Sequence, residues 1–269
     1  MSMLLKSSRV LLGKLCIATV VLVLVGCGTS GSGKSDAVIE RPTRPSVGDC
    51  GLALSSSWMQ GKEKRQSSAE SPPLPGIYRY AMTGSQAIPG AALRAKDLPT
   101  HSELFVTPSR KIGNATCFRV QKRFATDIAN TETYVIRGKS IYLVSLLIQA
   151  LGESQEISPN PPVLSASDAG SSWSGRFGGV TYGSYTFSVL GKRTYRVGAR
   201  QLRAVGISSS VSYRGAVSGT QVATAWISLD HDVVVAEKVR SRQNFGVSAL
   251  HLRSRSHLVS LQPEPLPES

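Results

Sequence analysis

The sequence predicts a mainly β protein dominated by antiparallel sheet, with few or no helices apart from an N-terminal signal helix. Apolar and polar residues alternate with period two over residues 78–82, 117–121 and 185–189. This alternation is typical of strands with one buried and one solvent-facing side. About two hundred residues remain after the N-terminal segments, which suits a single β-rich unit.

A first hairpin is predicted from residues 223–239. The apolar residues of 223–229 share one side of a strand, Asp230-His231-Asp232 forms a turn, and the chain returns over 233–239. The same Asp-His-Asp triplet is the best candidate for a metal site. Neighbouring ligands in a turn point apart, however, so the pattern favours a turn, and we predict no metal and no cofactor.

A second hairpin is predicted around Gly198, between residues 194–197 and 201–207. The uncharged run over residues 141–151 is compatible with a buried strand or a helix, and it is too short to cross a bilayer. Its start, Ile-Tyr-Leu-Val, favours the strand.

The first 26 residues are predicted to be a secretory signal peptide. Three cations, Lys6, Arg9 and Lys14, precede an apolar run over residues 15–25. Leu24-Val25-Gly26-Cys27 then resembles the lipobox of bacterial lipoproteins, in which the chain is cut between the positions held here by Gly26 and Cys27 and the Cys thiol is acylated. The resemblance implies a palmitate-type anchor at Cys27 and a place on the extracytoplasmic side of the cell membrane.

Residues 27–47 are expected to form the lipidated Cys and a flexible Gly/Ser/Pro tether. Within it, the segment GTSGSGKS over residues 28–35 matches the P-loop pattern G-x-x-x-x-G-K-[ST]. A phosphate cradle needs a following helix, and the chain reaches Pro42 and Pro45 too soon to form one. The tether is therefore favoured, and a P-loop site remains the alternative.

Residues 48–260 are predicted to form one extracytoplasmic β-rich domain, with an exposed loop over 55–75 and a disordered, proline-rich tail over 261–269. The cysteines support export. Cys16 leaves with the signal and Cys27 takes the lipid, so Cys50 and Cys117 remain as a pair that an oxidising compartment would bridge.

The exported part is basic. The chain has 31 Lys and Arg against 17 Asp and Glu, and removing the three signal cations leaves 28 against 17, a net charge of +11. Such a charge attracts anionic lipid headgroups, by roughly 1 kcal/mol per cation near the surface, or an anionic envelope polymer. Export and the lack of a recognised binding motif argue against nucleic acid as the partner.

One cationic cluster is predicted to contact an anionic surface, with a solvated sheet side as the alternative. Its members are Lys192, Arg193, Arg196, Arg200 and Arg203. A second set echoes it, namely Lys238, Arg240, Arg242, Arg253 and Arg255. If the hairpins that carry both sets lie side by side, these cations would cover one face.

Short motifs between residues 74 and 240 follow an order that resembles β-rich, mostly uncharacterised lipoproteins of actinobacteria. They include Pro75-Gly76-Ile77-Tyr78-Arg79-Tyr80, Gly170-Ser171-Ser172-Trp173 and Trp226-Ile227-Ser228-Leu229. The architecture is also distantly similar to the LolA and LppX lipoprotein carriers. That resemblance implies a strongly curved, half-barrel-like antiparallel sheet with an apolar concave side, and hence lipid binding. It carries over no binding residue.

These observations predict a membrane-anchored exported lipoprotein that acts as a non-enzymatic binding or carrier module for a hydrophobic or anionic envelope component. No catalytic residue is predicted, and the sequence contains no G-x-S-x-G nucleophile elbow. The alternative is an enzyme, with GTSGSGKS as a P-loop NTPase site or with a hydrolase site that is not visible in sequence.

The lipobox interpretation is tested by Cys27→Ala. The variant should neither incorporate labelled palmitate nor be cleaved, because the acylated thiol is required for both, and gel mobility with metabolic labelling measures the two effects. Cys16→Ala is the matched control, since Cys16 lies within the signal and should be dispensable. Normal labelling and maturation of Cys27→Ala would refute the anchor.

Overall fold

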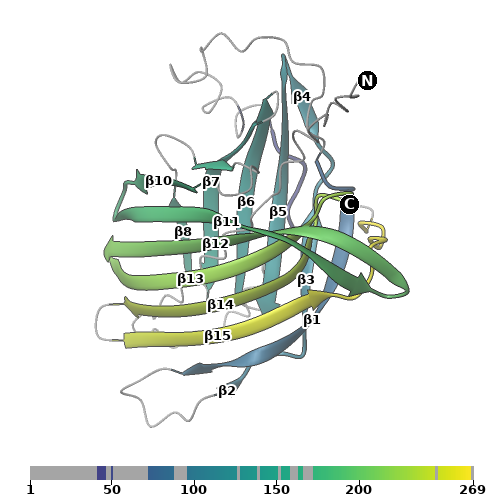
Figure 1. Cartoon of the computed structure of the whole chain (residues 1–269). Coiled ribbons are helices and arrows are strands. Elements are labelled where there is room, and N and C mark those ends of the chain that lie inside the picture. Colours follow the sequence, from purple (N-terminus) through teal and green to yellow (C-terminus); the bar gives the residue numbers. More distant parts are fainter. Residues whose placement is uncertain are drawn as a thin grey trace, which may run out of the picture.

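The protein is described by a computed structural model (Figure 1). The described residues are 41–46, 50, 72–87, 96–125, 128–137, 140–150, 153–157, 163–165, 172–245 and 248–267. The predicted signal, the lipidation site, the P-loop motif and most of the predicted 55–75 loop lie outside them. Within the described ranges, no helix has the length and hydropathy that a membrane span requires.

Every named element in the described part is a β-strand, as the sequence predicts. The strands of the first half are β1 (Gly76–Ala87), β2 (Lys96–Asp97), β3 (His101–Val106), β4 (Arg110–Ile112), β5 (Ala115–Ala125), β6 (Ile128–Arg137), β7 (Ser140–Ala150), β8 (Glu153–Ile157) and β9 (Val163–Ser165). Those of the second half are β10 (Ser172–Phe177), β11 (Thr181–Val197), β12 (Arg200–Gly215), β13 (Val217–Ser228), β14 (Val234–Phe245) and β15 (Ser248–Leu258).

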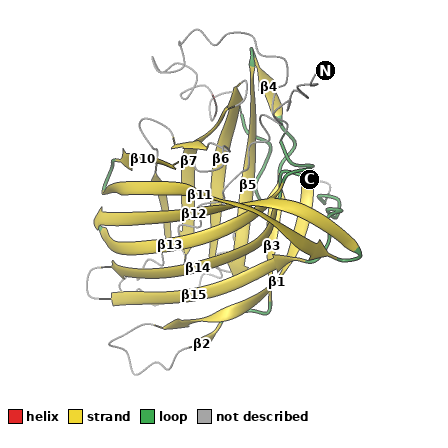
Figure 2. Ribbon diagram, in the orientation of Figure 1, coloured by secondary structure: helices red, strands yellow, loops and turns green. Residues whose placement is uncertain are grey.

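The strands form one antiparallel sheet whose order is β10-β11-β12-β13-β14-β15-β1-β3-β5-β6-β7-β8. The chain therefore returns to β1 after β15, where Tyr80 pairs with Leu258. Figure 2 shows the strands β11 to β15 crossing over β5, β6 and β7, so the sheet curls at β15 and β1 and its two halves face each other. This strongly curved, half-barrel-like sheet confirms the expected fold class.

Both predicted hairpins and the favoured strand are confirmed. β11 and β12 turn at Gly198, which has a φ of 56°. β13 and β14 turn through Asp230-His231-Asp232, where Asp232 adopts a φ of 52°, a left-handed conformation that Asp tolerates in turns. The uncharged run forms β7, which pairs with β6 on one side and with β8 and β9 on the other.

Alternation places one side of each strand in the space between the two halves of the sheet. The largest buried side chains there are aromatic and come from both halves, including Tyr78, Tyr80 and Phe118 from one and Phe187 and Tyr213 from the other. Phe118 stacks on Tyr134 with ring centres 5.5 Å apart. Such rings bury large areas, so the interior of the curl is a packed core.

Two glycines allow adjacent strands to approach closely, one where β1 meets β15 and one where β13 meets β14. Gly84 in β1 has a φ of 154° and Gly219 in β13 a φ of 139°. A Cβ atom at Gly84 would lie 2.0 Å from the carbonyl oxygen of Arg253, and one at Gly219 would lie 2.1 Å from that of Arg242. Because a real Cβ cannot approach so closely, these positions require glycine.

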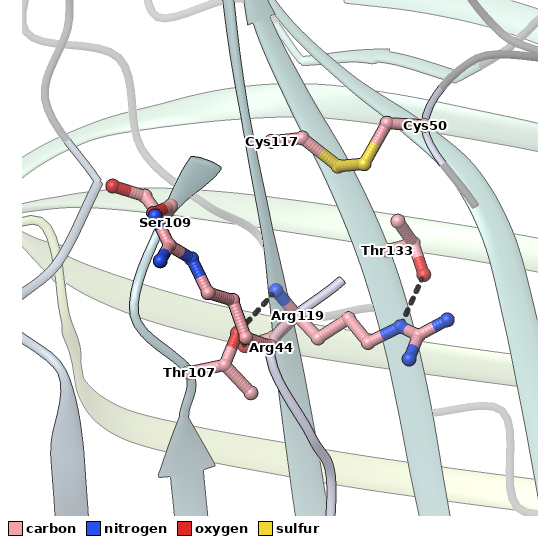
Figure 3. Close-up of a disulfide and its surroundings, with 7 residues drawn as sticks. All are labelled: Arg44, Cys50, Thr107, Ser109, Cys117, Arg119 and Thr133. Atoms are coloured by element: carbon pink, nitrogen blue, oxygen red, sulfur yellow. Dashed lines mark hydrogen bonds between the residues drawn. A yellow bond between two sulfur atoms is a disulfide. The ribbon is translucent and has the colours of Figure 1, made fainter. Parts of the chain in front are cut away.

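The predicted disulfide joins Cys50 to Cys117 in β5, with their Cα atoms 6.3 Å apart (Figure 3). Near it, Arg44 donates a hydrogen bond of 2.8 Å to the backbone oxygen of Ser109. Arg44 belongs to the segment that was expected to be a flexible tether up to residue 47. This hydrogen bond ties Arg44 to the segment between β3 and β4.

The tail also differs from the prediction of disorder over residues 261–269. Glu264 forms an isolated antiparallel bridge with Ile77 through two backbone hydrogen bonds of 2.9 Å. Its carboxylate also pairs with Arg79, Nε to Oε1, at 3.0 Å. Prolines on both sides of Glu264 leave it the amide that the bridge needs, so this short segment extends the curl beside the start of β1.

The disulfide gives a stability prediction. Replacing both Cys50 and Cys117 by Ser should lower the free energy of unfolding by about 4 kcal/mol on the loop-entropy model, because the bridge closes a long loop in the unfolded chain. Urea unfolding without reductant measures the loss, with reduced wild-type protein as the control. Two reactive thiols in the native, unreduced protein would show that the bridge does not form.

Candidate functional site

The predicted cationic cluster on β11 and β12 does not lie on one side of the sheet. Cross-strand partners share a side, and the register pairs Lys192 with Val205, Arg196 with Gln201 and Arg203 with Thr194. Arg193 and Arg200 belong to the other side, with Ala204 and Val197 as partners. The five cations are therefore divided by the strand pleat, which corrects the expectation of a single face.

One member of that cluster contacts an aromatic ring. The Arg193 guanidinium lies 4.7 Å from the centre of the Trp226 ring. Trp226 is on the outward side of β13 and pairs with Ala236 of β14. Since residues two apart on a strand share a side, Lys238 is on the same side of the sheet as Ala236 and Trp226.

The second set forms a compact group, which we call the cationic block. It consists of Lys238, Arg240, Arg242, Arg253 and Arg255. All five are exposed, and they occupy alternate positions of the adjacent strands β14 and β15. Lys238 is directly opposite Arg255, and Arg240 is directly opposite Arg253.

Like charges in directly opposite positions repel and destabilise a sheet. In β10 to β15 the one carboxylate is Glu237, which is 5% exposed and points to the interior. The nearest acid by register is Asp97 in β2, which pairs with Ser85, and Ser85 pairs with Arg253. The block therefore carries an excess of positive charge that its own strands do not neutralise.

A depression of about 270 Å³ lies within the block. Its lining includes Lys238, Arg240, Arg253 and Arg255, together with Thr83 and the backbone of Gly84 from β1. Cations around a concave surface focus a positive potential on it. The geometry suits a bound anionic group.

A second polar group lies in the interior, where Lys122 of β5 contacts Glu237 of β14. These strands are not neighbours in the sheet, so the ion pair crosses the curl from one half to the other. The side chains of Lys122 and Glu237 are 6% and 2% exposed. The Tyr80 hydroxyl of β1 reaches past β15 to β14, where it donates to the backbone oxygen of Val234 at 2.8 Å.

Glu132 of β6 adds a second buried carboxyl to this interior group. The Tyr134 hydroxyl donates to it at 2.5 Å. Burial raises the pKa of the Glu132 carboxyl to about 8; the hydrogen bond from Tyr134 opposes the rise, Glu237 adds to it and Lys122 reduces it. Glu132 is therefore mainly protonated at neutral pH, which leaves Lys122 balanced by Glu237 alone.

The interior is also polar beyond these charges. The side-chain amides of Asn130, Gln221 and Gln243 are buried, and they have no hydrogen-bond partner among the described residues. The concave side of the curl thus combines aromatic packing with a polar stripe. It differs from the apolar concave side that the resemblance to lipoprotein carriers implies.

Sequence reasoning missed Lys122, Glu132 and Glu237. One sign was available: Lys122 continues the inward alternation of Phe118 and Val120, where a charge is rare without a partner. The partner itself is 115 residues away and could not be identified from spacing. Among the described residues, no group of three or more His, Cys, Asp or Glu side chains is placed to hold a metal ion.

Comparisons with known proteins give structural neighbours but no family. No family model matches the chain, and no curated protein matches it. A presumed lipoprotein from Parabacteroides distasonis ATCC 8503 is 10% identical and has a TM-score of 0.42, over 73% of this chain and 99% of its own. A presumed exported protein with a YmcC-like fold from Bacteroides fragilis NCTC 9343 is 8% identical with a TM-score of 0.38, over 70% and 96%.

The hypothetical lipoprotein YmcC from Escherichia coli K12 is a third neighbour. It is 15% identical and has a TM-score of 0.26, over 70% of this chain and 86% of its own. At these TM-scores the likenesses carry no functional argument. The candidate site is therefore argued from its own residues.

The raised pKa of Glu132 predicts how stability depends on pH. An unfolded Glu titrates near 4.3, so between about pH 4.3 and 8 the folded state holds a proton that the unfolded state has lost. The contribution of Glu132 to the free energy of unfolding is thus fully present below about pH 4.3. It falls by up to about 1.4 kcal/mol per pH unit as the pH rises, and it stops changing above about pH 8.

Urea unfolding at a series of pH values measures this slope. Glu132→Gln keeps a neutral side chain at every pH, so the difference in unfolding free energy between wild type and variant should change across this window. Glu103→Gln on β3 is the control, since it makes the same substitution outside the interior group. A flat difference for Glu132→Gln would contradict the assignment.

Proposed function

We propose that this protein is an exported, lipid-anchored, non-enzymatic module that binds an anionic component of the cell envelope on its cationic block. The anchor at Cys27 would hold it at the extracytoplasmic side of the cell membrane. The observation that carries the proposal is the cross-strand pairing of Lys238 with Arg255 and of Arg240 with Arg253 around a depression, on strands whose one carboxylate, Glu237, points to the interior.

The energetics support an anionic partner. Directly opposed cations cost the free protein stability, and a bound anion removes that cost while it gains several charge-assisted contacts. Four of the five cations of the block are arginines, whose planar guanidinium groups match carboxylate and phosphate oxygens. A solvated surface alone gives no reason to place them opposite one another.

The same observations favour an anionic ligand over a hydrophobic cargo. The space between the two halves of the sheet is occupied by buried aromatic rings, by the Lys122–Glu237 pair and by buried amides. Four cations of the block, together with Thr83, Gly84, Val239 and Ser254, line the depression that the described residues form there. Binding on the outer surface also requires no opening of the curl.

The proposal is tested by charge reversal. Purified protein in neutral detergent should bind two unrelated polyanions, polyphosphate and polygalacturonate, and added salt should weaken both. Arg240→Glu with Arg253→Glu should lower each affinity by more than about tenfold, since each cation near an anionic surface contributes roughly 1 kcal/mol. Isothermal titration calorimetry measures the affinities.

The matched control is Arg196→Glu with Arg200→Glu at the tip of the β11–β12 hairpin. It changes the net charge by the same amount, but the two arginines lie on opposite sides of the hairpin and away from the block. Equal losses in both double variants would mean that only net charge matters. The absence of binding to either polyanion would refute the proposed function.

A further inference from the structure

The outer surface of β10 to β15 carries hydroxyl groups in rows that lead into the cationic block. The pairing register aligns the residues of one such row across seven strands. Its members, from one edge to β1, are Ser172, Ser188, Ser208, Thr224, Lys238, Arg255 and Thr83. Four consecutive hydroxyl side chains therefore precede two cations and a further hydroxyl.

A second row has three hydroxyl side chains between two arginines. It runs Arg176, Ser184, Ser212, Thr220, Arg242 and His251. A middle row runs Ser174, Thr186, Ser210, Val222, Arg240, Arg253 and Ser85, so an exposed valine interrupts its hydroxyls. In all three rows the outward positions of β10 to β12 are Ser, Thr or Arg, and none is acidic.

The rows have the dimensions of an extended polymer. Neighbouring strands are about 4.8 Å apart, so the hydroxyls of β10 to β13 extend roughly 19 Å beyond the cations of β14 and β15. A lipid headgroup or a free phosphate at the block would not reach them. A ligand that contacts both parts of a row must be long, must carry anionic groups, and must offer hydroxyl or ring oxygens to the Ser and Thr side chains.

We infer that the partner is a linear acidic polysaccharide that lies across the strands, with its anionic groups on the cationic block and neutral parts of its sugars along the hydroxyl rows. This inference rests on the proposed function and adds the class of ligand and its direction on the sheet. Ser and Thr hydroxyls both donate and accept hydrogen bonds, which suits sugar hydroxyls. The outward side of these strands is half-exposed or exposed at each hydroxyl of the first row, so the row is accessible.

The experiment compares two polyanions on hydroxyl variants. Ser208→Ala with Thr224→Val removes two adjacent hydroxyls of the first row and leaves the charge unchanged. Each lost hydrogen bond should weaken binding about fivefold, so the affinity for polygalacturonate should fall by about tenfold or more. The affinity for polyphosphate should fall by a smaller factor, because its oxygens accept hydrogen bonds from Ser and Thr but it has no hydroxyl groups to donate to them. Calorimetry in neutral detergent measures both.

A matched control removes two hydroxyls elsewhere. Ser260→Ala with Thr194→Val makes the same chemical changes, on the segment after β15 and on the hairpin tip, and should leave both affinities unchanged. Galacturonate oligomers of increasing length supply a second readout. Affinity for wild-type protein should continue to rise after an oligomer is long enough to cover the block, and this further rise should disappear in the Ser208→Ala, Thr224→Val variant.

The outcomes separate this inference from the proposed function. If both polyanions bind through the block, but the hydroxyl variant and oligomer length have no effect, the polysaccharide inference is overturned and anion binding stands. If phosphatidylglycerol micelles displace polygalacturonate through the block and polygalacturonate binds no more tightly than polyphosphate, the partner is a membrane surface and the inference is again overturned. If neither polyanion binds, the proposed function fails as well.

Discussion

The structure depends on one constraint: a single sheet must bury one of its sides, and here it does so by curling against itself. Every strand therefore has an inward position followed by an outward one, and the pairing register aligns these positions across the sheet. Inward side chains meet those of the opposite half of the sheet. Outward side chains form rows at the surface, so the composition of alternate residues determines both the core and the candidate site.

Because inward side chains are buried and outward ones are exposed, a charged side chain has a different energetic cost on each side of the sheet. In the interior, Lys122 and Glu237 are buried, and such a pair adds little net stability because desolvation offsets the attraction between them. Removing either partner would leave the other charged and uncompensated, which is far more costly. Glu132 avoids this cost by staying protonated. On the outer surface, water screens the arginines, so the sheet tolerates an arrangement that the interior would exclude.

Local patterns were sufficient to predict strands over residues 78–82, 117–121, 141–151 and 185–189 and both hairpins, because period-two alternation and turn residues are short-range properties. The disulfide was predicted from the two cysteines that remain after export. The distribution of cations could not be read in the same way. Lys192, Arg193 and Arg196 are close in sequence, yet the pleat divides them. Residues 238, 240 and 242 are spaced by two, which places them on one side, but their apposition with Arg253 and Arg255 depends on register.

Other features depend on contacts between distant segments. The pairing of Lys122 with Glu237 follows from the curl, which no single strand specifies. The bridge between Ile77 and Glu264 forms because β1, near the start of the domain, lies beside β15 at its end. A proline-rich composition indicated disorder, but one residue between prolines retains the backbone groups that pairing requires.

The disulfide has a mechanical consequence for a protein that is held by its N-terminus. Cys117 lies in β5, which has neighbours on both sides in the sheet. Tension from the proposed anchor would enter the domain through the sulfur bridge at this central strand, instead of peeling β1 from its start. Extraction of a central strand requires hydrogen bonds to two neighbours to break, so the bridge would let the domain bear load when its ligand moves relative to the membrane.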